Sequence, residues 1–347
     1  MFKRLQYILL LQVSLLALCI SCNGASDNEI SGSLNITSTS QINPSEKIKV
    51  MATMPILADW VNNVAQGRLE IESVIPYETD PHTYQAGARD IADIVSADII
   101  FSIGLGYEER WLSQLLDNHS DIKNIRLGEL VSPIETGNQD DSEHGNLESE
   151  HEDHDSEHED HDSEHEDHRH GIFDPHFWFD PSRAAIAVDS IADHLSELDP
   201  ASQDHYQVNA SEYIEQLMVL DKNIMDLVSK VPEHNRVIIT GHDSLGYLQD
   251  RYNIKALRSV VSSVTSESGL TPQNLINSVE FIKKHNVKVI FLETTYSDKY
   301  TKTVADESGI RIVTGLNVEN LNETNTTYID FMENNINIIV SNLELEE

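Results

Sequence analysis

The chain has 347 residues, of which 23 are Lys or Arg and 59 are Asp or Glu, so its formal net charge is −36. Such an acidic chain is unsuited to binding nucleic acid, because recognition of nucleic acid begins with clustered Lys and Arg that neutralise phosphates. The hydrophobic share of 39% is sufficient for a buried core, and the length suggests about two domains.

Residues 1–22 are typical of a secretory signal. A basic start precedes an apolar run that is too short and wrongly flanked for a membrane span. Cys22 follows Ser21 at the end of this run, which resembles the lipobox of bacterial lipoproteins, so we expect Cys22 to be lipidated. The alternative is a plain cleaved signal with an incidental cysteine. Residues 23–46 are rich in Ser, Asn, Thr and Gly, which predicts a flexible tether.

The body of the chain alternates between strand-like and helix-like segments, which predicts βα units around mostly parallel sheets. In the first half, strands are expected at 48–54, 69–75, 99–103 and 122–127, with helices at 55–65, 86–97 and 107–116. The pattern then restarts, with strands at 236–240, 254–261, 287–292 and 311–313 and helices at 244–252, 272–284, 299–307 and 328–343. We therefore expect two α/β lobes of similar make-up.

Residues 200–230 predict one long helix between the lobes. This segment has no glycine and no proline after Pro200, and its apolar residues recur at helical spacing. About 30 residues at a rise of 1.5 Å would span roughly 45 Å, enough for a stiff strut along both lobes. An ordinary long surface helix is the alternative. The body then divides into an N-terminal lobe at 47–198, a linker helix at 199–231 and a C-terminal lobe at 232–347.

Residues 142–170 contain near-copies of one seven-residue unit, SEHEDHD, SEHEDHD and SEHEDHR. Half of the 16 histidines fall in this His-rich tract, among many acids: His144, His151, His154, His158, His161, His165, His168 and His170. With almost no apolar side chains, we expect a disordered loop at 136–171 when metal is absent. Imidazole and carboxylate suit Zn, Ni or Cu, so the tract is expected to capture metal weakly, and a solvated acidic spacer is the alternative. Protonated imidazole cannot ligate, so capture should weaken as pH falls.

Three histidines outside this tract stand out by their position at predicted turns. His82 lies in DPHTY, His176 in DPHFWFDP, and His242 in TGHDS at the end of a predicted strand. Ligands of open α/β sheets collect beyond the carboxyl ends of strands, so loops from both lobes could meet in one cleft. The only cysteines, Cys19 and Cys22, lie in the signal, so His and carboxylates must hold any metal in the body. Spacing alone leaves a ligand role and an ordinary packing role equally open.

The segments DPHTY, DPHFWFDP, GHDSLGYL and VKVIFLETTYSDKYTKTVADESG resemble those of the zinc-binding substrate-binding lipoproteins of ABC importers, a group that also has manganese-binding members. The resemblance covers roughly residues 47–345, and an acidic His-rich insertion before the second motif is typical of the zinc members. It implies two (β/α)4 lobes joined by a single long helix, with the metal site in the cleft between the lobes.

Carried over residue by residue, the resemblance implies that His82, His176 and His242 bind the metal. The fourth ligand, a carboxylate in the last turn between elements, falls on Glu319, with Glu293 or a water molecule as alternatives. Three imidazoles and one carboxylate suit tetrahedral zinc. Manganese-binding relatives usually carry a carboxylate at the position of His242 and prefer more oxygen ligands.

The resemblance also implies a function: a monomeric receptor, anchored by lipid to a bacterial membrane in the periplasm or at the cell surface. It would carry Zn²⁺ as transported ligand to an ABC permease, and the strut would limit metal-linked motion to a modest lobe shift. The alternatives are a manganese or other divalent-metal receptor of the same family, and a secreted zinc hydrolase with an open water position. No HExxH motif supports the hydrolase, and no separate feature supports an adhesin.

Overall fold

The computed structural model describes residues 48–119, 121–136, 172–240, 244–257, 272–293, 298–321, 323 and 325–344. The predicted signal with Cys22, the tether and the histidines of the His-rich tract lie outside these residues. None of the described helices is both long enough and apolar enough to span a membrane.

The N-terminal lobe is built on four parallel strands in the order β2-β1-β3-β4. Its strands are β1 Lys49–Ala52, β2 Glu70–Ser73, β3 Ile99–Ser102 and β4 Asn124–Arg126, and its helices are α1 Pro55–Ala65, α2 Ala88–Val95, α3 Gln114–Asn118 and α4 Pro181–Leu198. A π-helical turn at Glu109–Ser113 precedes α3.

The C-terminal lobe repeats this order in the sheet β6-β5-β7-β8, which is again parallel throughout. Its strands are β5 Val237–Ile239, β6 Lys255–Leu257, β7 Val289–Glu293 and β8 Arg311–Leu316, and its helices are α6 Gly246–Tyr252, α7 Pro272–Lys284, α8 Asp298–Ser308 and α9 Tyr328–Leu343. The predicted fold class, two α/β lobes with parallel sheets and a long linking helix, is confirmed.

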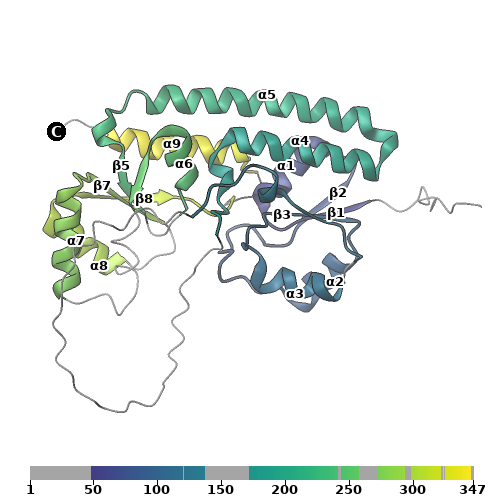
Figure 1. Cartoon of the computed structure of the whole chain (residues 1–347), viewed down its shortest axis with the longest axis horizontal. Coiled ribbons are helices and arrows are strands. Elements are labelled where there is room, and N and C mark those ends of the chain that lie inside the picture. Colours follow the sequence, from purple (N-terminus) through teal and green to yellow (C-terminus); the bar gives the residue numbers. More distant parts are fainter. Residues whose placement is uncertain are drawn as a thin grey trace, which may run out of the picture. The chain divides into compact units, whose positions relative to one another are not determined.

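The linking helix, α5 at Gln203–Val228, has 26 residues and follows one 3₁₀ turn at Pro200–Ser202. It packs against α1 and α4 of the first lobe and against α6 and α9 of the second. Asn209 donates to the carbonyl oxygen of Val64 in α1 at 2.9 Å. Nearer the carboxyl end of α5, Asp221 accepts hydrogen bonds from Arg251 and Tyr252 of α6. The helix thus binds both lobes along its length, as Figure 1 shows.

Both faces of each sheet are covered, which is the normal condition of a parallel sheet. In β1, Val50 and Ala52 point to the layer formed by α1, α4, α5 and α9, while Met51 points to the opposite side with Ile94 of α2. In β7, Phe291 points to the same layer as Val50 and Ala52. Its neighbours Ile290 and Leu292 point to the opposite side and pack in a separate cluster with α7 and α8. Figure 1 shows these two layers of helices on opposite sides of the sheets.

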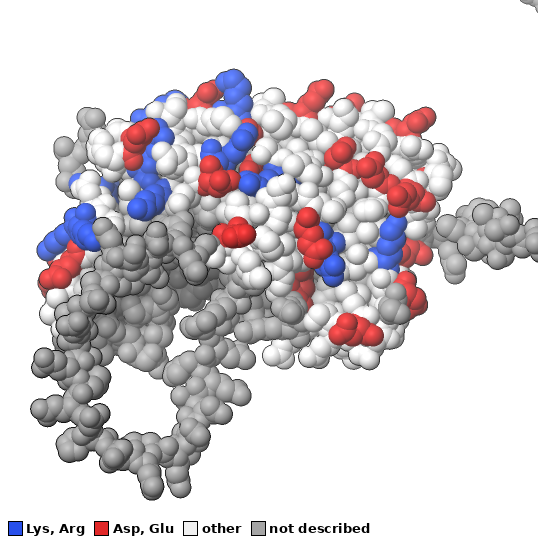
Figure 2. All heavy atoms as spheres, viewed as in Figure 1, with Lys and Arg blue, Asp and Glu red and all other residues white. Residues whose placement is uncertain are grey.

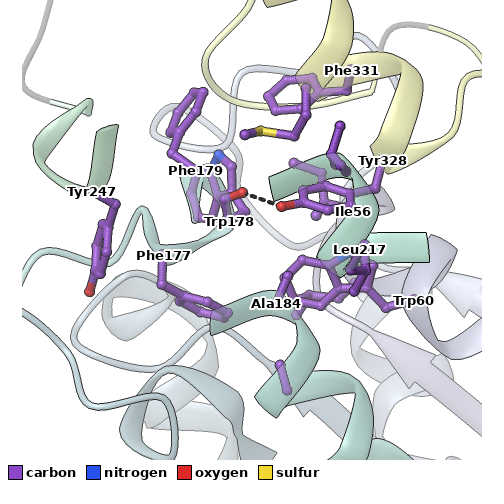
Figure 3. Close-up of a cluster of buried hydrophobic side chains, with 14 of the residues drawn as sticks. Ile56, Trp60, Phe177, Trp178, Phe179, Ala184, Leu217, Tyr247, Tyr328 and Phe331 are labelled. Atoms are coloured by element: carbon purple, nitrogen blue, oxygen red, sulfur yellow. Dashed lines mark hydrogen bonds between the residues drawn. The ribbon is translucent and has the colours of Figure 1, made fainter. Parts of the chain in front are cut away.

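The main hydrophobic core contains residues of both lobes. In Figure 3, Trp60 of α1, Tyr328 of α9 and Phe177, from the turn before α4, lie together with other buried aromatic rings. The rings of Trp60 and Tyr328 meet edge to face with centroids 5.2 Å apart, and Phe177 is 5.8 Å from Trp60. The hydroxyl of Tyr328 donates to the carbonyl oxygen of Trp178 at 2.6 Å. This shared core fixes one lobe against the other.

Two helical segments differ from the sequence-based expectation. In place of the predicted helix at 107–116, the structure has the π-helical turn at Glu109–Ser113, which runs directly into the short helix α3. Helix α4 was not predicted, although Asp180 caps it by accepting from the N–H of Ser182 and Pro181 occupies its first turn.

Acidic and basic side chains lie side by side on the face shown in Figure 2.

Candidate metal centre

Three of the residues expected to bind metal lie together in the structure. One donor atom from each of His82, His176 and Glu319 lies within 4.8 Å of the other two. Nε2 of His82 is 3.2 Å from Oε1 of Glu319, and Nε2 of His176 is 3.9 Å from the same oxygen. Two ligands of a tetrahedral zinc ion, each at 2.0–2.1 Å from it, are about 3.3 Å apart. The three side chains are therefore close to the spacing that one shared ion requires.

The three residues come from both lobes. His82 lies in the loop between β2 and α2, and His176 lies just before α4, both in the N-terminal lobe. Glu319 follows β8 in the C-terminal lobe. His242, the third predicted imidazole, lies outside the described residues, and Glu293 is the last residue of β7. The described part of the centre is thus formed by two imidazoles of one lobe and a carboxylate of the other.

The Asp-Pro-His motif forms the same turn at both histidines. Oδ1 of Asp80 accepts the backbone N–H of His82 at 2.9 Å, and Oδ1 of Asp174 accepts that of His176 at 2.9 Å. Such a bond between an aspartate and the residue two places later is an Asx turn, and the intervening proline fixes its own φ in a range suited to a turn. The motif therefore sets the backbone from which each imidazole projects.

Asp174 also contacts the ring of His176. Its Oδ1 lies 2.7 Å from Nδ1, and the imidazole is fully buried. A carboxylate at this position holds the proton on Nδ1 and leaves the lone pair of Nε2 for a metal. From the other lobe, Tyr247 donates to the carbonyl oxygen of Asp174 at 2.8 Å. A Cβ atom added to Gly246 would lie 2.4 Å from Oδ2 of Asp174, so α6 packs directly on this carboxylate.

The second oxygen of Glu319 is held by a tyrosine that sequence reasoning missed. Tyr107 donates its hydroxyl to Oε2 at 3.0 Å. Burial, and secondly the nearby carboxylate of Glu319, raise the pKa of Tyr107 well above its ordinary value, so the phenol stays a neutral donor. No motif marks Tyr107. The only signal is the glycine-containing turn before it, where Gly104 and Gly106 have φ of 74° and 85°.

Glu108, the residue after Tyr107, anchors the loop and is not a candidate ligand. Its Oε1 accepts the hydroxyl of Thr53 at 2.6 Å and the N–H of Ile103 at 2.7 Å, and its Oε2 accepts the N–H of Gly104 at 3.0 Å. Burial raises the pKa of Glu108, while these hydrogen bonds oppose the rise. Its carboxylate is fully used in fixing the backbone that carries Tyr107.

The turn that carries Glu319 is fixed to the N-terminal lobe on both sides. The indole N–H of Trp178 donates to the carbonyl oxygen of Val318 at 3.1 Å. The amide of Asn320, which is buried, donates to the carbonyl oxygens of Pro76 at 3.3 Å and Thr79 at 3.4 Å. The residues on either side of Glu319 therefore hold its carboxylate toward the histidines.

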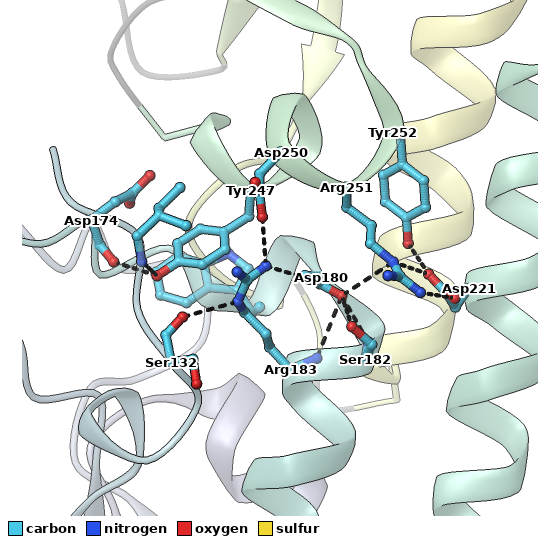
Figure 4. A network of polar contacts seen from close by, with 12 residues as sticks. Ser132, Asp174, Asp180, Ser182, Arg183, Asp221, Tyr247, Asp250, Arg251 and Tyr252 are labelled. Atoms are coloured by element: carbon cyan, nitrogen blue, oxygen red, sulfur yellow. Dashed lines mark hydrogen bonds and ion pairs between the residues drawn. The ribbon is translucent and has the colours of Figure 1, made fainter. Parts of the chain in front are cut away.

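A polar network outside the centre connects α4 of the N-terminal lobe, α6 of the C-terminal lobe and the linking helix α5 (Figure 4). Arg183 of α4 pairs with Asp180 at 2.6 Å and with Asp250 of α6 at 3.0 Å, and it lies 4.8 Å above the ring of Tyr247. On the other side of α6, Arg251 and Tyr252 both bond to the buried Asp221 of α5. These contacts link α4, α6 and α5 across the two lobes.

Comparison of the sequence with protein families gives a match over residues 50–342 to the family ZnuA, described as zinc-uptake complex component A, periplasmic. A manganese-binding lipoprotein MntA of Halalkalibacterium halodurans is 26% identical over 301 residues, with 86% of this chain and 89% of that protein covered. A metal ABC transporter substrate-binding lipoprotein ScbA of Streptococcus cristatus is 27% identical over 308 residues, with 86% of this chain and 90% of that protein covered.

Comparison of the fold gives solved structures of the same architecture. The periplasmic zinc-binding protein TroA from Treponema pallidum superposes with a TM-score of 0.67 at 24% identity, over 86% of this chain and 99% of that one. A cadmium-bound periplasmic metal-binding protein from Candidatus Liberibacter asiaticus gives the same TM-score at 23% identity, over 86% of this chain and 100% of that one. At these identities the likeness shows the fold.

Proposed function

The chain belongs to the family of the periplasmic zinc-uptake component A and is therefore a substrate-binding protein of a metal ABC transporter, and we propose that its cargo is Zn²⁺. The family consists of solute-binding receptors of importers, not of enzymes. In this role the protein would capture the ion outside the inner membrane and deliver it to an ABC permease.

One observation carries the proposal: donor atoms of His82, His176 and Glu319, from both lobes, lie within 4.8 Å of one another. Imidazole nitrogen with a single carboxylate is a donor set that zinc accepts readily, whereas manganese favours more oxygen. We propose that His242 supplies a further imidazole. A site closed by three imidazoles and Glu319 would leave no position for an activated water, which suits capture and release of the ion.

Manganese is the second candidate cargo. Relatives named as manganese-binding, such as the protein from Halalkalibacterium halodurans, match most of this chain. The donor set argues the other way, because two of the three described donors are nitrogen. A competition experiment in which Zn²⁺ and Mn²⁺ bind to the purified protein decides which ion is preferred.

We propose that a lipid on Cys22 anchors the protein to a bacterial membrane, in the periplasm or at the cell surface, and that it works as a monomer. Both relatives described above are named lipoproteins, which supports the anchor, and the one from Streptococcus cristatus is named an ABC transporter substrate-binding lipoprotein, which supports the permease partner. We also propose that the His-rich tract, outside the described residues, captures further ions weakly. Calorimetry with the full chain and with a chain lacking residues 142–170 should give fewer bound ions for the shorter chain, and equal numbers would contradict this role.

The substitution His82→Ala tests the centre. It removes one donor, so the tight zinc site should weaken by more than the roughly tenfold to hundredfold loss that follows removal of an outer partner of a ligand. Competition with a chelating dye measures this loss. The matched control is His194→Ala on α4, whose ring contacts Glu197 at 3.5 Å. Unchanged affinity in His82→Ala would remove His82 from the site.

A further inference from the structure

We propose that Tyr107 sets the metal preference of the centre by restricting Glu319 to ligation through one oxygen. The hydroxyl of Tyr107 donates to Oε2 at 3.0 Å, while Oε1 lies 3.2 Å from Nε2 of His82 and 3.9 Å from Nε2 of His176. The two oxygens of one carboxylate thus face different partners. This inference rests on the proposed function, since it concerns the choice of ion at the same site.

The division of the carboxylate matters because zinc and manganese differ in the number of ligands they prefer. Zinc in a closed protein site takes four, and one oxygen of Glu319 fits that count. Manganese prefers more oxygen ligands, as in octahedral sites. A carboxylate that gives both oxygens to one ion must turn the second oxygen toward the ion. In Glu319 this rotation would draw Oε2 away from the phenol and lengthen the hydrogen bond to Tyr107.

The phenol cannot readily follow such a rotation, because its ring packs against three other rings. It meets the ring of Trp178 edge to face with centroids 5.7 Å apart, and the rings of His82 and His176 at 5.7 Å and 6.2 Å. Its backbone is held by the hydrogen bonds of Glu108 described above. Tyr107 is therefore a rigid donor. It favours the low coordination number of zinc and disfavours the added oxygen that manganese requires.

The test is the substitution Tyr107→Phe in the full chain, with dissociation constants for Zn²⁺ and Mn²⁺ measured by chelator competition. Loss of the donor should weaken zinc binding by roughly tenfold to hundredfold, while manganese binding stays equal or tightens. The preference for zinc over manganese should therefore fall by at least the same factor. In protein loaded with Co²⁺, the intense visible absorption of a four-coordinate ion should weaken as a second oxygen joins.

The matched control is Tyr206→Phe, because the hydroxyl of Tyr206 also donates to a carboxylate oxygen at 3.0 Å, that of Asp199 at the start of the linker region. It should change thermal stability without changing either the preference or the cobalt spectrum. Two results in Tyr107→Phe would overturn the inference. One is an equal weakening of zinc binding and manganese binding. The other is an unchanged preference for zinc together with an unchanged cobalt spectrum.

A third substitution, Glu319→Ala, separates failure of this inference from failure of the proposed function. If Glu319→Ala loses tight zinc binding and Tyr107→Phe keeps the preference, only the inference about Tyr107 is wrong. If Glu319→Ala binds zinc as tightly as the unchanged protein, the proposed centre itself is wrong.

Discussion

Asp174 contacts His176 twice, once at its backbone N–H and once at Nδ1 of the ring. The first contact forms the turn and the second orients the imidazole. Asp80 makes the corresponding turn at His82. The Asp-Pro-His motif thus specifies local geometry as well as a histidine, because the aspartate and proline determine where the imidazole points.

The sequence indicates some of these residues and not others, for physical reasons. His82 and His176 stand out through a motif that is local in the chain, although their role as ligands was predicted through the resemblance. Glu319 was predicted only through the resemblance, because a single acid in a turn carries no sign of its own that it binds a metal. Tyr107 was missed, because its contact with Glu319 spans 212 positions and depends on how the two lobes pack. Long-range contacts of this kind have no signal in a single sequence.

The substitution Gly246→Ala should weaken zinc binding without touching any ligand. The added methyl would lie 2.4 Å from Oδ2 of Asp174, so the carboxylate must move and His176 loses its orientation. We expect a loss of roughly tenfold to hundredfold in zinc affinity, as for other outer partners of a ligand. The control is Gly87→Ala, where the nearest atom would lie at 3.5 Å, an ordinary contact. Equal affinities in the two variants would contradict this account of Asp174.

At the scale of elements, the helices with a strong period were predicted most closely. The expected ranges 272–284 and 328–343 coincide with α7 and α9. Helix α9 also has a clear start, because Thr327 and Asp330 form a capping box. Strand ends were less accurate: β5 is two residues shorter than expected, since the hydrogen bonds to neighbouring strands decide where a strand ends.

Asp59 joins three helices that belong to both lobes. It lies in α1 and its Oδ2 accepts the hydroxyl of Tyr213 in α5 at 3.1 Å and the N–H of Tyr328 in α9 at 3.2 Å. Burial raises the pKa of Asp59 to about 6, while these two hydrogen bonds oppose the rise and nearby Asp330 adds to it. The folded state therefore binds a proton at Asp59 more tightly than the unfolded chain does.

This raised pKa predicts the pH dependence of stability. Between the ordinary value of 3.8 and about 6 the folded state holds more protons at Asp59, so this group's contribution to stability grows as pH falls from 7 toward 4. Asp59→Asn should remove that contribution, and the free energy of unfolding relative to the unchanged protein should shift by about 1 kcal/mol between pH 7 and 5.

Denaturant unfolding at several pH values measures this shift. Asp226→Asn, at an exposed carboxylate on α5 that pairs with Lys222, is the control. A difference between Asp59→Asn and the unchanged protein that does not vary with pH would contradict the role of Asp59.

For the whole molecule, the arrangement of the lobes is held by more than the linking helix. The core around Trp60 and Tyr328 is shared between lobes, Asn320 donates to carbonyls of the loop that precedes His82, and Arg183 pairs with Asp250. The two-lobe organisation followed from the repeated alternation of strands and helices. The contacts between the lobes could not be predicted from this alternation, because they join residues far apart in the chain.

These contacts predict a small response to metal. Rotation of one lobe against the other by ~20° or more would break the shared core and the hydrogen bonds of Asn320, so zinc binding should produce a smaller shift. Crystal structures of the full chain with and without zinc measure it. A hinge opening of ~20° or more would show that the linking helix and shared core do not restrict the lobes.

The central claim is that side chains of both lobes hold one zinc ion. X-ray absorption at the zinc edge, on the full chain loaded with one equivalent of zinc, tests it most directly. The account predicts a four-coordinate ion with nitrogen and oxygen neighbours at about 2.0–2.1 Å, whose neighbours change in both His82→Ala, from the N-terminal lobe, and Glu319→Ala, from the C-terminal lobe. Zinc neighbours that remain the same in either variant would contradict it.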